Sequence, residues 1–127
     1  MACVKLYNKD GDAKAQQIQT NIEKKFGFLP EVFQAMGQNG DFTAAMLQLS
    51  EVSGKNLDVK TKELIAIAVS AVNGCTYCLC AHRSSAKAAG ASDEEITSAL
   101  EVASMMSAFN NFIKALNLKV DMKCPVD

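Results

Sequence analysis

The residues best suited to chemistry lie in one stretch, GCTYCLCAH at positions 74–82, which holds three of the five cysteines and the only histidine. Cys75 and Cys78 are three residues apart, and His82 lies four residues beyond the second thiol. If the stretch is helical, this spacing puts all three side chains on one face. One thiolate could then attack a substrate, the other thiol could resolve the product, and the imidazole could take up the proton. The spacing therefore favours dithiol chemistry.

The residues before this stretch strengthen the interpretation. Asn73-Gly74 is a helix stop, so Cys75 is expected at the start of a new helix, where unpaired N–H groups and the dipole favour a thiolate. Glu63 is the one acid in the expected helix 59–72. If that helix and the cysteine helix fold back antiparallel, Glu63 lies roughly 16 Å before the turn and His82 roughly 10 Å after it. The carboxylate could then hold the imidazole's tautomer or pass on its proton.

The chain that must position these residues is expected to be all-α, because it has only two prolines, seven glycines and no alternating β-branched runs. Turn residues and apolar periodicity predict about six helices in a helical bundle, with the cysteine pair at the start of a central helix. No repeat or second domain is evident, so residues 1–127 are expected to form a single domain. The expected helices are about 12–26, 30–36, 41–52, 59–72, 75–89 and 92–116, the last with a possible break at Asn110-Asn111.

Composition excludes several classes of function. A net charge of −1 with scattered lysines gives no electrostatic basis for a nucleic-acid partner. The N-terminus does not resemble a secretory leader, and no apolar run approaches the ~18 residues that a membrane span needs. We therefore expect a cytoplasmic protein, in which clustered cysteines indicate redox or metal chemistry rather than a disulfide scaffold. No glycine-rich nucleotide loop is present, so we expect no bound cofactor and an external dithiol as reductant.

Two apolar features predict a homo-oligomer. Residues 64–72 are apolar nearly all round, which is typical of a helix buried in a bundle or at a subunit interface. Met105, Met106, Phe109 and Phe112 form a second apolar stripe at helical spacing. Such a stripe indicates a core or subunit contact rather than a cofactor site.

Glu63, then eleven residues, then Cys75-x-Tyr77-Cys78-x-x-x-His82 resembles the AhpD-like alkylhydroperoxidase branch of the carboxymuconolactone decarboxylase family. The resemblance covers mainly residues 57–100. It implies that Cys78 is the peroxidatic cysteine, that Cys75 resolves it, and that Glu63 and His82 relay protons. It also implies an all-helical subunit that assembles into trimers, hexamers or similar rings.

The sequence departs from the family pattern at Tyr77, where the best-defined alkylhydroperoxidases carry a second histidine. The same parts would equally serve a disulfide reductase, so the substrate is expected to be a small hydroperoxide or a disulfide. The cysteine pair argues against a γ-carboxymuconolactone decarboxylase, because those relatives generally lack it.

Two other classes of function stay open from the residues alone. One is a metal or iron–sulfur site formed by Cys75, Cys78, Cys80 and His82, for which closure within one chain is awkward. The other is a structural helical module whose cysteines are inert. Cys3 and Cys124, in the termini, are expected to be free thiols.

Overall fold

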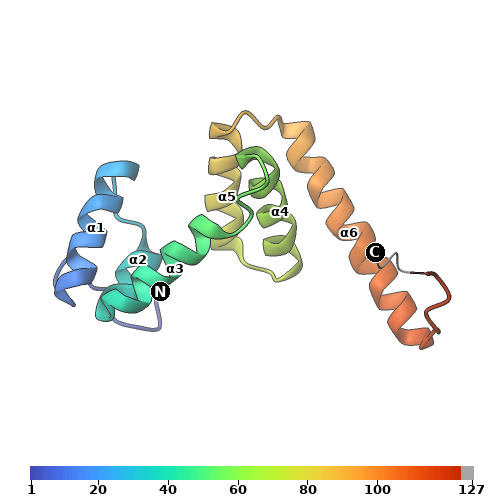
Figure 1. Cartoon of the computed structure of the whole chain (residues 1–127), viewed down its shortest axis with the longest axis horizontal. Coiled ribbons are helices and arrows are strands. Elements are labelled where there is room, and N and C mark those ends of the chain that lie inside the picture. Colours follow the sequence, from blue (N-terminus) through green and yellow to red (C-terminus); the bar gives the residue numbers. More distant parts are fainter. Residues whose placement is uncertain (124–127) are drawn as a thin grey trace. The chain divides into compact units, whose positions relative to one another are not determined.

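The computed structural model describes residues 1–123, and every element of secondary structure within them is a helix (Figure 1). The all-α prediction is confirmed, as are the six α-helices and the cysteine pair at the start of one of them. The last helix runs unbroken through Asn110-Asn111. Cys124 lies outside the described residues. In chain order the elements are α1 (Ala13–Phe26), α2 (Glu31–Ala35), a 3₁₀ helix (Met36–Gln38), α3 (Gly40–Val52), α4 (Val59–Val72), α5 (Thr76–Ala88) and α6 (Asp93–Leu116).

The chain divides into two compact units, one of residues 1–55 and one from Asn56 onward, and the single-domain expectation stays a prediction. In the first unit the fully buried Gln19 of α1 joins three segments. Its amide donates to the carbonyls of Tyr7 and Phe33, each at 2.8 Å, and its carbonyl accepts the Lys9 N–H at 2.9 Å. These bonds satisfy a buried polar side chain while they anchor the N-terminal segment and α2 to α1.

Two expected helix starts in the first unit were wrong by one or two residues. Asn39, not Asp41, caps α3: its side-chain oxygen accepts the Phe42 N–H at 3.0 Å. Asp41 lies in the first turn instead, where it accepts a hydrogen bond from Lys14 at 2.7 Å. Pro30 is the residue before α2 rather than its first helical residue. Asn and Asp are comparable caps, so a sequence that offers both leaves the start of the helix open.

The second unit contains α4, α5 and α6, with α5 and α6 both packed against α4. Its buried core comprises four residues, against which Leu64, Leu79 and Leu100 also pack. Within one chain α4 is not buried all round, because Ile65, Val69 and Val72 are at least half exposed. Of the two expected settings for this apolar helix, burial at a subunit interface stays a prediction. The four core residues are Ile67, Ala86, Ala91 and Ile96.

The start of α6 is fixed by the predicted capping box. Ser92 Oγ accepts the Glu95 N–H at 3.1 Å, and a Glu95 carboxylate oxygen accepts the Ser92 N–H at 2.9 Å. The other oxygen of Glu95 accepts from Lys60 Nζ at 2.7 Å, which ties the start of α4 to the start of α6. These donors, Lys60 foremost, hold the pKa of the Glu95 carboxyl below its ordinary value of 4.5.

We predict that Glu95→Gln lowers the free energy of unfolding at neutral pH. This difference from wild type should become smaller in acid. A carboxyl whose folded pKa is depressed stabilises the fold fully above its unfolded pKa and loses that contribution as pH falls through the folded pKa. The difference between wild type and variant should therefore be constant above about pH 5 and shrink below 4.5. Urea unfolding at equal protein concentration from pH 3 to pH 7 measures it; a deficit independent of pH would contradict the assignment.

None of the helices within residues 1–123 combines the length and the apolarity that crossing a membrane requires.

Candidate active site

The turn between α4 and α5 fixes where the first thiol lies. α4 ends at Val72 with Asn73 as its C-cap, and Gly74 adopts φ 70°, a left-handed conformation that glycine reaches without steric cost. The Gly74 N–H bonds the Ala71 carbonyl at 3.2 Å, and the Cys75 N–H bonds the Ser70 carbonyl at 2.9 Å. This pair of bonds is a Schellman motif. It reverses the chain in so few residues that Cys75 directly caps the next helix.

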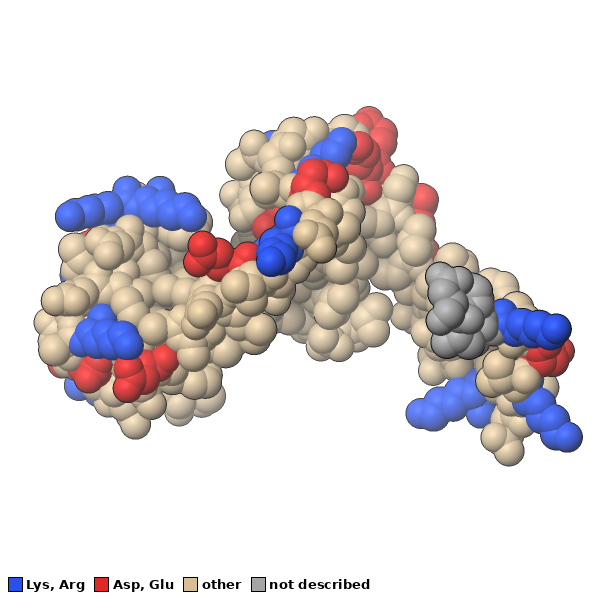
Figure 2. Space-filling view, in the orientation of Figure 1, with Lys and Arg blue, Asp and Glu red and all other residues tan. Residues whose placement is uncertain are grey.

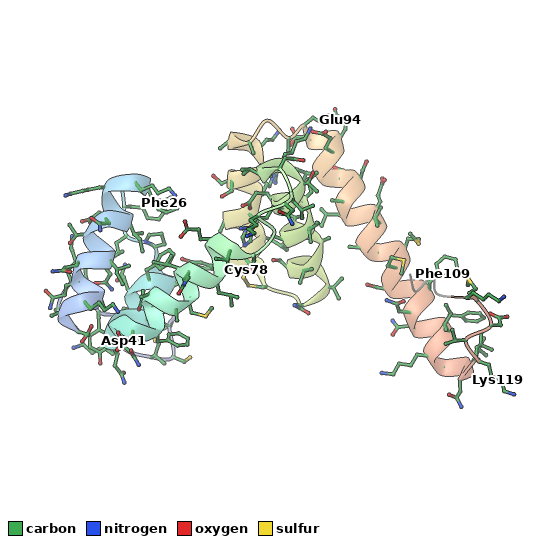
Figure 3. All side chains as sticks on the ribbon, in the orientation of Figure 1. Phe26, Asp41, Cys78, Glu94, Phe109 and Lys119 are labelled. Atoms are coloured by element: carbon green, nitrogen blue, oxygen red, sulfur yellow. A yellow bond between two sulfur atoms is a disulfide. The ribbon has the colours of Figure 1, made fainter. Side chains whose placement is uncertain are left out.

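Cys75 and Cys78 form a disulfide at the start of α5, with their Cα atoms 5.3 Å apart (Figure 3). Cys75 is the N-cap of the helix, and the Cys78 N–H donates to its sulfur at 3.2 Å. Both residues are partly buried. A thiolate released at Cys75 by reduction would therefore lie where a helix N-terminus stabilises negative charge.

The second part of the site is a contact between α4 and α5. Glu63 Oε2 lies 2.7 Å from His82 Nδ1, so the antiparallel packing of the two helices joins the residues whose proximity the sequence predicted. The Glu63 side chain is only 15% exposed, whereas that of His82 is 39% exposed. A carboxylate can only accept a hydrogen bond, so the imidazole tautomer that pairs with it is the one that carries its proton on Nδ1. Nε2 is then left as the ring nitrogen that can exchange protons with a reactant.

The two parts share one helix. His82 follows Cys78 by four residues on α5, a spacing that puts both on one face of the helix. Leu79, between them, packs against the buried core and holds α5 against α4. The cysteine pair and His82 are thus carried by α5, and Glu63 by α4, against which α5 packs.

The remaining candidate residues lie outside this arrangement. Among the cysteines of residues 1–123, Cys3 and Cys80 are unpaired and exposed. Tyr77 is 47% exposed, in the first turn of α5. No three cysteine, histidine or acidic side chains within the described part of the chain converge on a point that could hold a metal ion. The metal alternative through Cys75, Cys78, Cys80 and His82 stays a prediction.

Sequence reasoning missed two features of the site. It did not identify Ser70, a buried residue whose carbonyl fixes the Cys75 N–H. It also did not anticipate that the sulfur of Cys75 would act as a helix cap. Gly74, directly after the C-cap of α4, was the available signal, because glycine at this position is typical of Schellman motifs.

A sequence model of the carboxymuconolactone decarboxylase family matches residues 40–119, more than half of the chain. The chain belongs to this family. Within the family it falls in the AhpD-like branch. The match includes all of α3, α4, α5 and α6, and hence both parts of the site.

Three similar proteins define the likeness more closely. Uncharacterized protein 4 in the cox locus of Paracoccus denitrificans is 37% identical over 86 residues, which cover 63% of this chain and 78% of that protein. The alkyl hydroperoxide reductase AhpD of Frankia alni is 38% identical over 72 residues, or 57% of this chain. The match spans only 39% of that reductase's length. The AhpD core from Rhodospirillum rubrum superposes with a TM-score of 0.78 over 95% of each chain at 24% identity, which shows a common fold.

Proposed function

We propose that the protein is a thiol-dependent oxidoreductase that reduces small hydroperoxides, with Cys75 and Cys78 as its redox pair. The observation that carries the proposal is the Cys75–Cys78 disulfide at the start of α5, with His82 on the same helix and its partner Glu63 on α4. The names of relatives such as the alkyl hydroperoxide reductase AhpD of Frankia alni support the same reaction class.

The reaction balances with an external dithiol as reductant. The Cys78 thiolate attacks the hydroperoxide; an S–O bond forms, the O–O bond breaks, and the alkoxide leaving group takes a proton to become an alcohol. The Cys78 sulfenic acid then condenses with the Cys75 thiol, which forms the disulfide and releases water. The dithiol reduces that disulfide by exchange, becomes oxidised itself, and restores both thiols.

His82 and Glu63 are assigned to the movement of protons in this cycle. Neutral His82 can accept the Cys78 thiol proton at Nε2, and the resulting imidazolium can deliver it to the leaving alkoxide. Glu63 orients the ring through Nδ1 and stabilises the imidazolium while it exists. Because Glu63 is largely buried, water screens this interaction less than it would at an exposed site.

A disulfide reductase without peroxidase activity would use the same residues, and steady-state kinetics separates the two. With dithiothreitol as the dithiol, we expect hydroperoxide consumption from tert-butyl hydroperoxide well above the rate without protein. Hydroxyethyl disulfide, tested in parallel, measures disulfide exchange. Turnover of the disulfide alone would establish the reductase instead, and turnover of neither would overturn both assignments.

The proposal also includes the setting of the reaction. We place the protein in the cytoplasm, where a reducing environment keeps the external dithiol donor available. We also propose that it works as a homo-oligomer, for which α4 and α6 provide the apolar surface.

A further inference from the structure

The two sulfurs of the Cys75–Cys78 pair have different surroundings. Cys75 is the N-cap of α5, and its sulfur accepts the Cys78 N–H at 3.2 Å, so it lies at the positive end of the helix dipole. Cys78 lies within the first turn of α5 (Figure 3). At a rise of 1.5 Å per residue, His82 is about 6 Å along the helix axis from Cys78 and about 10 Å from Cys75. One sulfur is therefore next to the helix N-terminus, and the other is nearer the imidazole.

The acidic residues at the helix starts point to the same difference. The first turn of α6 carries Asp93, Glu94 and Glu95, and Figure 2 shows acidic side chains gathered where α6 begins. Acids in this position balance the positive end of the helix dipole. Residues 76–79, the first turn of α5, include no acidic residue. At α5 the group in the balancing position is the Cys75 sulfur, which becomes able to carry a negative charge when the disulfide opens.

We propose that the external dithiol attacks the sulfur of Cys78 and that Cys75 is the leaving thiolate, so that the donor becomes bound to the protein through Cys78. In thiol–disulfide exchange the sulfur that forms the more stable thiolate leaves faster. The N-terminus of α5 gives that advantage to Cys75. This assignment rests on the proposed redox role of the cysteine pair, but it does not depend on hydroperoxide as the substrate.

The exchange balances in two steps. The first donor thiolate forms an S–S bond to Cys78 while the Cys75–Cys78 bond breaks, and the electron pair of the broken bond stays on Cys75. The second donor thiolate attacks the donor sulfur of the mixed disulfide, closes the donor's own disulfide and releases Cys78. The donor loses two electrons and the cysteine pair gains them. His82 is one helical turn from the sulfur released last, where its imidazolium can return a proton.

The same difference between the sulfurs fits the oxidative half of the proposed cycle. Cys75, stabilised as a thiolate by the helix N-terminus, can attack the Cys78 sulfenic acid without a base of its own. Cys78 has to lose its proton before it attacks a hydroperoxide, and it is the thiol nearer to His82. Cys75 then enters and leaves the disulfide as a thiolate in both directions of the cycle.

The turns at the two ends of α5 offer a matched pair of positions for a test. At both turns a glycine with positive φ, 70° at Gly74 and 86° at Gly90, closes the same pattern of two backbone hydrogen bonds. At the second turn, the Gly90 N–H bonds the Lys87 carbonyl at 3.0 Å and the Ala91 N–H bonds the Ala86 carbonyl at 2.9 Å. Chain neighbours apart, no atom of the described residues lies within 4 Å of a Cβ placed at either glycine. Valine at either position is therefore opposed mainly by the backbone conformation.

Trapping the mixed disulfide tests the assignment on the whole oxidised chain. Free thiols, with exposed Cys3 and Cys80 among them, are first blocked with iodoacetamide. The protein is then mixed with glutathione, a monothiol, and quenched within seconds with N-ethylmaleimide. Trypsin releases residues 63–83 as one peptide, in which tandem mass spectrometry locates both groups. We expect glutathione on Cys78 and maleimide on Cys75, in about fivefold or greater excess over the reverse arrangement.

The glycine variants test the cause of this preference. In Gly74→Val the turn can no longer hold the Cys75 sulfur at the helix N-terminus, so the preference should fall to about twofold or less. Gly90→Val strains the other end of α5 in the same way and should keep the wild-type preference. An unchanged preference in folded Gly74→Val would overturn the role given to the helix N-terminus. If that variant fails to fold, the mapping on the wild-type chain decides alone.

The outcome on the wild-type chain is independent of peroxidase activity. Glutathione mainly on Cys75, equally on both cysteines, or on neither would overturn the inference. A protein that consumes no hydroperoxide but takes glutathione on Cys78 would lose the proposed peroxidase function and keep this inference. Hydroperoxide turnover together with glutathione on Cys75 would do the reverse.

Discussion

Replacing Cys78 by serine should abolish hydroperoxide reduction, with a fall of about 10³-fold or more to the rate of the dithiol donor alone. The serine hydroxyl keeps the size of the side chain but is not ionised near neutral pH, so no nucleophile remains to attack the O–O bond. Steady-state consumption of tert-butyl hydroperoxide with dithiothreitol measures the effect. Because α5 begins at Thr76 and does not depend on the disulfide for its helical hydrogen bonds, the variant should retain its helix content.

Two matched variants assign the roles of the thiols. Cys75→Ser should still react once with hydroperoxide and then stop at the Cys78 sulfenic acid, which a dimedone probe detects, because no resolving thiol remains. Cys80→Ser should behave like wild type, since Cys80 is exposed and unpaired two residues further along the same helix. If Cys75→Ser lost the first reaction and Cys78→Ser kept it, the two cysteines would have to exchange roles.

The second large effect is expected at the Glu63–His82 pair. His82→Gln should lower the hydroperoxide rate by about 10²-fold or more, because the general acid–base group is lost. Glu63→Gln preserves shape and can still bond Nδ1, but it removes the charge that stabilises the imidazolium, so a fall of about 10- to 100-fold is expected. The double variant should be no slower than His82→Gln, since residues that act as one unit are not additive.

The dependence of rate on pH separates a role in proton transfer from a merely structural one. Loss of the buried carboxylate also disturbs the α4–α5 contact, so a lower rate alone would be ambiguous. A positioning role requires Glu63→Gln to move the pH at which the rate rises, whereas a packing defect lowers the rate equally at every pH. Glu101→Gln, the same substitution at an exposed site on α6, should change neither the rate nor its pH profile.

Local signals in the sequence predicted the elements of the site well. The Ser92 capping box and the Asn73-Gly74 stop each depend on a few neighbouring residues, and both are present as expected. The proximity of Glu63 and His82 also followed from the sequence, because helical rise and a tight turn fix the offset between antiparallel helices. Their catalytic roles stay predictions.

Features that depend on what packs against a helix could not be predicted in the same way. The apolar stretch 64–72 indicated burial in a bundle or at a subunit interface, and Ile65, Val69 and Val72 are exposed in the single chain. Composition shows that a surface is apolar but not whether this chain or another covers it. The bond between the Cys78 N–H and the Cys75 sulfur likewise depends on the turn geometry, which residue types alone leave open.

The most direct test of the dithiol account is the reaction of fully reduced protein with a limiting amount of hydroperoxide, followed by thiol counting and peptide mapping. The account predicts rapid loss of two thiols for each hydroperoxide consumed and a peptide pair joined through Cys75 and Cys78. Slow oxidation spread over several cysteines, with exposed Cys3 and Cys80 among the products, would contradict it.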